Sequence, residues 1–208
     1  MKTQMRKLIC LTAAGLVIAA SLMAQSSAAA KPAAKQSLEQ RVRAIEDRDA
    51  ILKALNQYTY LVDFGNNIHE YTDLYTDDAI FQPNAANGAT PTSPGAVVGR
   101  AGMEKWITNE WQMRDRLIAV GHYRLHVFNE PEITLDGDHA TARSYFQTTD
   151  NDNGRIYVVS IGLYEDKFVR SPDGRWRMKE RLLMRQGGVA RGTAGAPLET
   201  RAPAAGKQ

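Results

Sequence analysis

The chain has 208 residues, of which 43% are hydrophobic and 24% charged, a composition typical of a globular protein that excludes collagen-like and disordered chains. Lysine and arginine number 26 against 23 aspartate and glutamate, a formal net charge of +3. Three of the basic residues, Lys2, Arg6 and Lys7, lie in the first thirty positions, which hold no acidic residue, so the rest of the chain is formally neutral. We therefore expect no nucleic-acid partner, because such partners select clustered positive charge.

The first thirty residues have the pattern of an export signal. The basic residues precede an apolar run from Leu8 to Met23, which contains the only cysteine, and small residues follow up to Ala30. The run of about 16 residues is shorter than the roughly 20 that cross a bilayer. We predict a cleaved signal peptide over residues 1–30 and an exported protein, periplasmic or secreted, without membrane contact after signal removal. A retained N-terminal anchor is the alternative, and cleavage after Ala24 is also consistent with the pattern.

The remaining chain is predicted to form one domain between two irregular segments. A linker of Ala, Lys and Pro spans residues 31–36, and a tail rich in Ala, Gly, Pro and Arg spans residues 188–208. The segment between them, residues 37–187, contains about 150 residues, which is enough for one hydrophobic core. Since the only cysteine lies in the predicted signal, the mature domain has no thiol chemistry.

Helical patterns dominate the first half of this domain. Apolar residues recur at intervals of three and four from Ser37 to about Asp63, which predicts one long helix or two abutting ones. A short helix over residues 68–74 and a strand over 79–82 follow. A polar loop over 83–94 separates them from a third helix that begins near Gly99 and reaches about Leu117.

The second half reads as consecutive strands. They are predicted over residues 122–128, 132–135, 140–148, 156–169 and 176–184, with turns at Asp136-Gly137-Asp138 and Ser171-Pro172-Asp173-Gly174. Helices followed by hairpins predict an α+β fold with an antiparallel sheet. A strongly curved sheet closed by N-terminal helices forms a cone, and polar groups inside its apolar interior are the natural place for function.

Several short motifs follow one another along this domain: Asp49-Ala50-Ile51, Tyr58, Asp63, Leu74 to Ala79, Val98-Gly99-Arg100, His126, Ile133 to Ala140, and Asp173 to Arg177. In this order and spacing they resemble the SnoaL-like branch of the nuclear transport factor 2-like superfamily. The resemblance covers nearly all of residues 38–186 and implies a cystatin-like α+β cone in a homodimer or homotrimer. Members include scytalone dehydratase, bile acid dehydratase, lindane dehydrochlorinase, polyketide cyclases and relatives of steroid isomerase, so the fold alone does not decide the reaction.

The resemblance implies that Asp63 and His126 form a catalytic pair inside the cone. A core-facing carboxylate such as Asp63 must be paired, although it could instead hydrogen-bond the turn at Gly65. His126 matches the family's histidine by its distance from Ile133, but Glu130 stands where the family has asparagine. His122 shares its strand face and competes for the role.

Two further residues match family positions. Tyr58, about one helical turn before Asp63, would donate a hydrogen bond to a carbonyl or leaving hydroxyl, or else serve only as a core tyrosine. Tyr60 is a weaker substitute on another face of the helix. Arg181 matches an arginine that stabilises an anion. Its odd spacing from Trp176 places the two on opposite faces unless a bulge intervenes, which would make Arg181 a solvated base instead.

We expect neither a cofactor nor a metal ion. A free imidazole titrates near pH 6.5, so it can take a proton from a carbon beside a carbonyl and return it to a leaving group. On a strand, His122 and His126 would lie about 13 Å apart, too far to share a metal. Aromatic residues that would line the cavity or pack beneath it are Phe81, Trp106, Trp111, Tyr145 and Tyr164.

The leading functional hypothesis is a cofactor-independent lyase of the dehydratase type, or an isomerase, that acts on a small apolar or polycyclic molecule. The alternatives are a noncatalytic domain that binds an apolar ligand or assembles with other subunits, and a polyketide cyclase or hydrolase on the same scaffold.

Overall fold

The computed structural model describes residues 36–83, 85 and 93–188. Contacts within the chain divide it into two units, Met1–Ser37 and Leu38–Gln208, and the fold below is that of the second unit. The predicted signal peptide, nearly all of the predicted linker and the predicted tail from residue 189 lie outside the described residues. In the part of the chain that the structure covers, no helix has the length and apolar character needed to cross a membrane.

Three helices precede most of the sheet. The long predicted helix is a single one, α2 (Leu38–Phe64). It is followed by the short α3 (Ile68–Thr72), whose N-cap Asn67 accepts hydrogen bonds from the backbone N–H groups of His69 and Glu70. The third helix, α4 (Gly99–Ile118), begins at Gly99, where φ is +68° and glycine is favoured.

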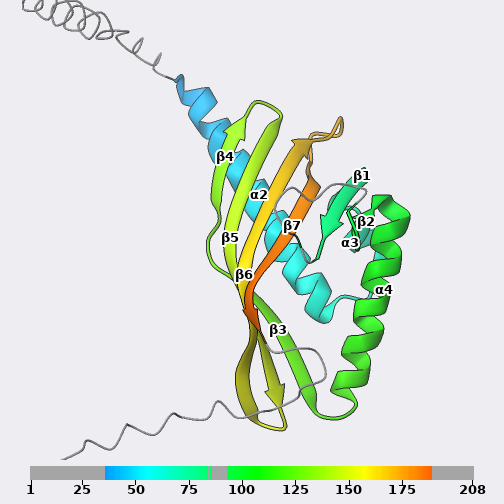
Figure 1. The fold of residues 1–208 in the computed structure, drawn as a ribbon. Helices are drawn as coiled ribbons and strands as arrows, with labels where there is room; N and C mark the ends of the chain where they lie inside the picture. Colours follow the sequence, from blue (N-terminus) through cyan, green and yellow to red (C-terminus); the bar gives the residue numbers. More distant parts are fainter. Residues whose placement is uncertain (1–35, 84, 86–92, 189–208) are drawn as a thin grey trace, which may run out of the picture. The chain divides into compact units, whose positions relative to one another are not determined.

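The strands form one sheet of seven, in the order β2-β1-β7-β6-β5-β3, with β4 also paired to β5 (Figure 1). Their bounds are β1 (Tyr75–Gln82), β2 (Val97–Val98), β3 (His122–Phe128), β4 (Glu132–Asp136), β5 (His139–Asp152), β6 (Arg155–Arg170) and β7 (Trp176–Gly188). The predicted α+β class, with a curved sheet closed by N-terminal helices, is confirmed, and the strands from β3 to β7 lie where the sequence pattern predicts them.

Three features of the sheet differ from the sequence-based prediction. The strand β1 begins at Tyr75, before the predicted start at residue 79. The strand β1 pairs parallel to β7, through Phe81 and Arg181 among others, so the sheet is mixed rather than antiparallel. Antiparallel hairpins follow directly from consecutive strands, but β1 is separated from β7 by α4 and five other strands, so no hairpin fixes its direction. The two-residue strand β2, Val97–Val98, is too short to leave a periodic pattern.

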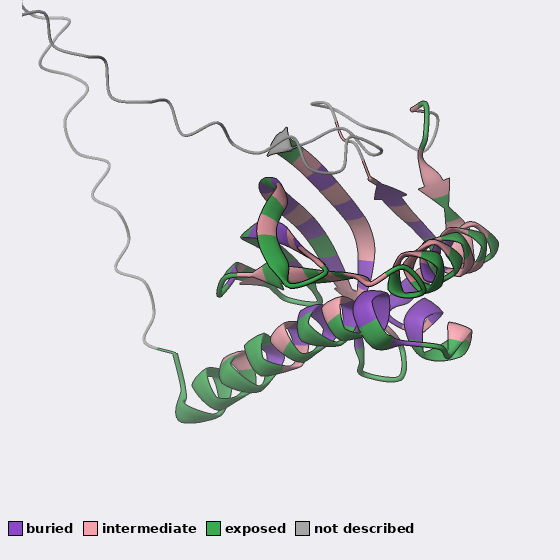
Figure 2. Cartoon of the chain, turned by 90° about the horizontal axis from the view of Figure 1, so that it is seen from below, coloured by how far each residue is buried: buried purple, intermediate pink, exposed green. Residues whose placement is uncertain are grey.

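The core lies between the helices and one face of the sheet. Residues of β5 alternate between exposed and buried positions over most of the strand, and its buried residues belong to the same hydrophobic core as those of α2, so the sheet has an inner and an outer face. Figure 2 shows the C-terminal part of α2 buried beneath the strands, whereas its N-terminal part is exposed. The indole of Trp176 on β7 donates a hydrogen bond to Asp47, which ties the middle of α2 to the sheet.

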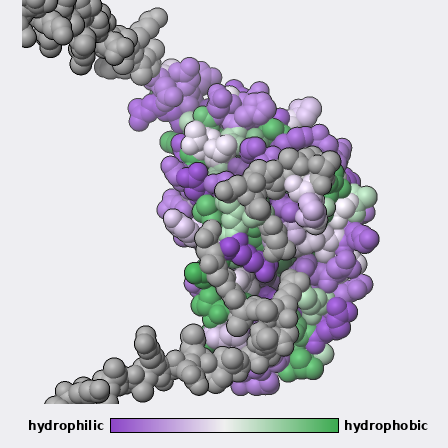
Figure 3. Space-filling view, in the orientation of Figure 1, coloured by the Kyte–Doolittle hydropathy of each residue, from purple (hydrophilic) through white to green (hydrophobic). Residues whose placement is uncertain are grey.

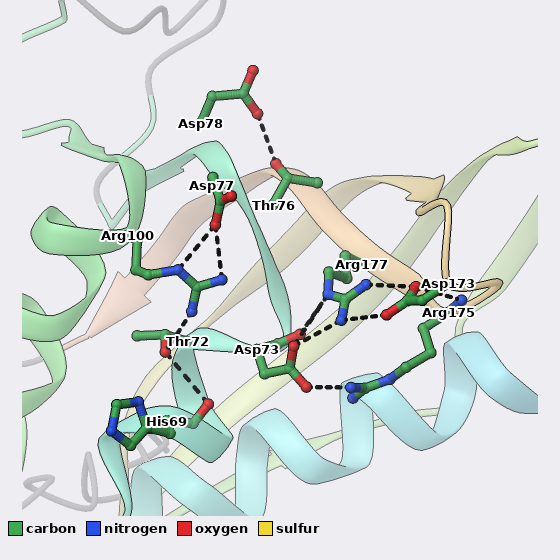
Figure 4. A network of polar contacts seen from close by, with 10 residues as sticks. All are labelled: His69, Thr72, Asp73, Thr76, Asp77, Asp78, Arg100, Asp173, Arg175 and Arg177. Carbon is green, nitrogen blue, oxygen red and sulfur yellow. Dashed lines mark hydrogen bonds and ion pairs between the residues drawn. The ribbon is translucent and has the colours of Figure 1, made fainter.

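The motifs that suggested the family form polar contacts beside α3 (Figure 4). Asp73 accepts hydrogen bonds from Arg177 and pairs with Arg175, and Asp173 also pairs with Arg177. Burial alone would raise the pKa of Asp73, but the hydrogen bonds from the two arginines lower it below its usual value. Arg100 on α4 binds Asp77 on β1 and the hydroxyl of Thr72. These motif residues therefore join elements of the fold to one another.

Candidate active site

The structure brings Asp63 and His126 together inside the cone. One carboxylate oxygen of Asp63 lies 2.6 Å from Nδ1 of His126, and the other accepts a hydrogen bond of 2.8 Å from the backbone N–H of the same residue. Asp63 is 8% exposed, so its charge is largely removed from water and is compensated by these two contacts. Since both carboxylate oxygens bind one residue, the imidazole is held in a single orientation.

The end of α2 is held by side chains of α4. The indole of Trp111 donates to the carbonyl of Leu61 at 2.8 Å, and Arg114 donates to the carbonyl of Gly65 at 2.7 Å. The carbonyl of Leu61 also accepts a hydrogen bond of 3.0 Å from the backbone N–H of Gly65, so the side chains of α4 add to the backbone contacts there. The positive charge of Arg114 suits the C-terminal end of a helix. A Cβ at Gly65 would lie 2.4 Å from the carbonyl oxygen of Leu61, so the tight turn after Asp63 requires glycine. The predicted alternative, that Asp63 itself binds this turn with its side chain, does not occur.

The strand β3 supplies the imidazole and two other polar groups on the same face. Its inner residues His122, Arg124 and His126 alternate with exposed apolar residues. His122 pairs through Nε2 with Asp152 at 2.9 Å, and Arg124 forms two hydrogen bonds of 2.6 and 2.7 Å with Asp150. The two histidines that competed in the sequence therefore have different acidic partners.

A cavity of about 220 Å³ lies against His126. Most of its wall is apolar or aromatic, contributed by Tyr58, Val62, Phe81, Pro83, Trp106, Phe146, Tyr164 and Leu183. The polar residues on the wall are His126, Thr148, Glu110 and Arg185. Among the residues that the structure describes, Asp63 is not on this wall, so it supports His126 from behind. A cavity that combines aromatic and aliphatic side chains with a few polar groups is typical of a small-molecule site.

Tyr58 lies on the cavity wall and is 3% exposed, whereas Tyr60, the weaker candidate, is 61% exposed and outside the cavity. Burial raises the pKa of Tyr58 well above its usual value, so its hydroxyl keeps its proton at neutral pH. A neutral phenol donates a hydrogen bond, which is the role predicted for this residue.

Arg181 lies inside the cone but not on the cavity wall as the structure describes it. It is 1% exposed, so the alternative that it is a solvated base is wrong. The pairing of β6 with β7 skips Lys179, since Phe168 pairs with Met178 and Lys167 with Glu180. This bulge reverses the side-chain alternation and lets both Trp176 and Arg181 point inward. Nη1 of Arg181 lies 3.6 Å from Asp166, its acidic partner.

Sequence reasoning did not identify the acids Asp150, Asp152 and Asp166, nor Thr148 on the cavity wall. Asp150 and Asp152 are two residues apart at the end of β5, directly opposite Arg124 and His122 in the ladder. Charged residues alternate on both strands, so the pairs could have been predicted from the sequence if the register of β3 on β5 had been known. Asp166 follows the same inward alternation on β6 as Tyr164.

The pair of Asp63 and His126 has the geometry of an oriented base. When Nδ1 carries the ring proton, it donates a hydrogen bond to the carboxylate, and Nε2 keeps its lone pair. This tautomer is assigned from the hydrogen bonds. Such an imidazole accepts a proton from a substrate, and the carboxylate stabilises the cation that forms. Within the described ranges, no group of three or more His, Cys, Asp or Glu side chains could hold a metal ion.

The sequence profile of the SnoaL-like domain matches residues 43–182, and this chain belongs to that family, with the nuclear transport factor 2-like fold. A solved nuclear transport factor 2-like protein with a cystatin-like fold from Novosphingobium aromaticivorans is 26% identical, with a TM-score of 0.60 over 76% of this chain and 95% of that chain. The matched residues include all four candidate positions, Tyr58, Asp63, His126 and Arg181.

Two other relatives are different kinds of protein from each other. The small subunit of anthranilate 1,2-dioxygenase from Burkholderia cepacia is 25% identical over 134 residues, which is 60% of this chain and 78% of that protein. ActVI-ORFA from Streptomyces coelicolor is 21% identical, with a TM-score of 0.52 over 66% of this chain and 96% of that chain, and at this identity it shows the fold alone. Membership of the family therefore leaves the activity to be argued from the site.

Proposed function

We propose that this protein is a cofactor-independent lyase or isomerase that removes a proton from a carbon beside a carbonyl group. The observation that carries the proposal is the contact between His126 and Asp63, 2.6 Å long, at the wall of a cavity that is largely lined by aromatic and aliphatic residues. A dehydratase is the favoured subtype.

In a dehydration, the step balances without an outside reagent. Nε2 of His126 takes the proton from the carbon, and the electron pair of the broken C–H bond forms a C=C bond. The bond from the neighbouring carbon to its hydroxyl breaks, and the imidazolium returns the proton to that oxygen, which leaves as water. In an isomerisation the proton returns to another carbon instead. Tyr58 would donate a hydrogen bond to the carbonyl oxygen as negative charge develops on it.

The size of the cavity favours a small substrate. A cavity of about 150 Å³ can hold benzene, so about 220 Å³ suits a molecule with one ring better than a polycyclic one. The aromatic wall supports an apolar ring, and His126 and Thr148 supply the polar contacts.

The test uses a one-ring β-hydroxy ketone, 3-hydroxycyclohexanone. Its dehydration gives a conjugated enone with strong ultraviolet absorbance, and in D2O proton abstraction appears as deuterium beside the carbonyl by NMR. We expect both signals with the parent protein and a loss of about 10² to 10⁴-fold for His126→Ala.

His122→Ala is the matched control. His122 lies on the same strand face, its side chain is 21% exposed against 23% for His126, and it also pairs with a carboxylate, but it is not on the described cavity wall. We expect its activity within a few-fold of the parent. Equal loss in both variants, or activity that survives His126→Ala, would exclude the proposed base. A parent protein that gives neither signal would contradict the lyase or isomerase proposal and leave the cyclase or hydrolase alternative.

A second function, as a subunit of an assembly, is favoured by the outer face of the sheet. Seven large apolar side chains there, which we call the outer patch, are 44–70% exposed on β3, β5 and β6: Tyr123, Leu125, Val127, Tyr145, Ile156, Val158 and Ile161. Hydrophobic residues are visible on the flank of the molecule in Figure 3, where β5 and β6 lie. Exposed apolar patches of this kind mark protein interfaces. We propose that this patch joins copies of the chain in a homodimer or homotrimer, and the dioxygenase subunit among the relatives supports an assembly.

Light scattering after gel filtration tests the assembly. We expect Ile156→Lys, at 70% exposure in the outer patch, to lower the mass to that of a monomer, and Ile45→Lys, at 67% exposure on α2, to leave it unchanged. A parent that is monomeric, or a variant of the patch that stays oligomeric, would contradict this proposal.

We also propose that the chain is exported. The test is to recover the protein from a bacterial periplasm and to determine its N-terminal sequence, which should show cleavage near Ala24 or Ala30.

A further inference from the structure

A buried charged pair lies behind the tyrosines of the cavity wall. Arg181 and Asp166 are 1% and 2% exposed, and their nearest charged atoms are 3.6 Å apart. Among the described residues, the two carboxylate oxygens of Asp166 have no hydrogen-bond partner. The same is true of the Nε of Arg181. The pair is therefore held by charge and packing rather than by directed hydrogen bonds, which is costly unless another contact stabilises it.

That other contact is with the rings of two tyrosines. The guanidinium carbon of Arg181 lies 3.9 Å from the ring centre of Tyr58 and 4.0 Å from that of Tyr164. At such distances a guanidinium is attracted by the electron-rich faces of aromatic rings. The rings of Tyr58 and Tyr164 lie 6.2 Å apart, edge to face, and both belong to the cavity wall. One cation thus contacts two hydroxyl-bearing residues of the same cavity.

The two hydroxyls remain donors at neutral pH. Burial raises the pKa of both tyrosines, and the charge of Arg181 opposes this rise without reversing it. Hydrogen bonds from Tyr58 and Arg181 also oppose the rise at Tyr164, so the two phenols and the guanidinium form one polar network. A neutral hydroxyl beside a positive charge is a better donor toward an anion than an isolated one, because the cation stabilises negative charge on its far side. A substrate that stays neutral and apolar would gain no hydrogen bond from these two hydroxyls.

We infer that Tyr164, on β6, is a second hydrogen-bond donor of this cavity beside Tyr58, and that Arg181 is a positioning residue that holds both rings and places positive charge behind them. The inference rests on the proposed function and adds two residues, Tyr164 and Arg181, to those that would stabilise the enolate formed from its carbonyl substrate. Proton abstraction by His126 creates this negative charge, and the two phenols receive it. Arg181 does not touch the substrate in this arrangement.

The test uses two one-ring probes of similar shape, 4-nitrophenolate and 4-nitrotoluene. The first carries the negative oxygen of an enolate and the second has a methyl group there. Binding is measured by calorimetry at a pH where the phenol is ionised and the tyrosines are neutral. We expect Tyr164→Phe and Tyr58→Phe each to weaken 4-nitrophenolate binding about 10- to 100-fold, as expected for hydrogen bonds to a charged group, and to change 4-nitrotoluene binding less than about twofold.

Tyr75→Phe is the matched control. Tyr75 is 1% exposed in the same aromatic cluster, with its hydroxyl 3.2 Å from that of Tyr71, but it is not on the described cavity wall. We expect this variant to bind both probes as the parent does. A Tyr164→Phe variant that binds 4-nitrophenolate normally, or weakens both probes equally, would show that Tyr164 only packs, and a parent that binds neither probe would equally overturn the inference.

Arg181→Lys tests the positioning role, because it keeps the charge and removes the planar stack. We expect it to fold and to lose part of the preference for 4-nitrophenolate over 4-nitrotoluene, whereas an unchanged preference would remove Arg181 from the inference. Failure of the proposed function appears elsewhere, in deuterium exchange that does not depend on His126. The two failures are therefore distinguishable.

Discussion

Two of the buried carboxylates, Asp63 and Asp166, are held in opposite ways. Asp63, 8% exposed, uses both oxygens to accept hydrogen bonds from His126. Asp166, 2% exposed, has no hydrogen-bond partner among the described residues and faces Arg181 across 3.6 Å. The first acid orients a group on the cavity wall, and the second neutralises a charge behind it.

The two acids therefore contribute differently: Asp63 fixes the geometry of His126, and Asp166 balances the charge of Arg181. Removing the oriented acid should damage the reaction more than the fold, since the backbone and ring of His126 lose their direction. Removing the unbonded acid or its partner should damage the fold more than the reaction, since a single buried charge is left behind.

The largest effect is expected for Asp63→Asn. The amide can donate to Nδ1 of His126, which would place the ring proton on Nε2 and leave no lone pair toward the cavity. Replacing the acid of a comparable pair in this way lowers turnover about 10⁴-fold. Dehydration of 3-hydroxycyclohexanone measures the loss, and ¹⁵N NMR of the imidazole reports the tautomer.

Asp152→Asn, the equivalent change at His122, serves as the control and should leave turnover within a few-fold of the parent. A loss smaller than tenfold in Asp63→Asn, with the tautomer unchanged, would mean that the acid does not orient the base.

The next largest effect is a loss of stability in Arg181→Met. It leaves the Asp166 carboxylate buried without a counter-charge, and we expect a loss of about 3–5 kcal/mol in the free energy of unfolding. Adding Asp166→Leu should restore much of it, because the charge is then removed as well. Urea denaturation of the parent, the single variant and the double variant measures both changes. A double variant less stable than Arg181→Met would show that the carboxylate has a further stabilising contact.

Much of this fold follows from local patterns. The period of α2 and the alternation from β3 to β7 predict their positions closely, because each element buries one face. The parallel pairing of β1 with β7 does not follow in this way, since nothing in the pattern of Tyr75–Gln82 states which strand lies beside it. The bulge at Lys179 is equally hidden, and it decides that Arg181 is buried.

The candidate site is predictable only in part, for the same reason. Asp63 and His126 were identified through the family resemblance, and their separation of 63 residues is not a local pattern. The partners of His122 and Arg124 depend on the register of β3 on β5. A bulge after Thr148 in the pairing of β5 with β6 shows how easily such registers shift by one residue.

A smaller effect is expected in the pH dependence of stability. Burial raises the pKa of Asp166 to about 6, and Arg181 only partly opposes this rise. Because the folded state holds this proton more tightly than the unfolded state, stability from this group is greatest at low pH and falls as pH rises from about 4 to 6. The change is roughly 3 kcal/mol for a shift of this size.

Asp166→Asn cannot titrate, so it provides the reference. The stability of the parent minus that of Asp166→Asn, measured by urea denaturation at each pH, should decrease between pH 4 and 6. A difference that rises over this range would mean that Arg181 lowers the pKa of the carboxyl instead, and the contrast with Asp63 would then disappear.

The smallest effect is expected at a third carboxylate, Asp73, which combines hydrogen bonds with exposure. Its side chain is 36% exposed and binds Arg175 and Arg177. If burial sets the cost of losing an acid, Asp73→Ala should lower stability by only about 1 kcal/mol, although it breaks more hydrogen bonds than a change at Asp166.

The side chain of Asp173 is 47% exposed, so Asp173→Ala should lower stability by less than Asp73→Ala does. Hydrogen bonding from Arg177 lowers the pKa of Asp173 to about 2, so its contribution is present above pH 4 and is lost as pH falls toward 2, opposite in direction to that of Asp166. A loss at Asp73 as large as that in Arg181→Met would show that directed hydrogen bonds, rather than burial, control the stability of these pairs.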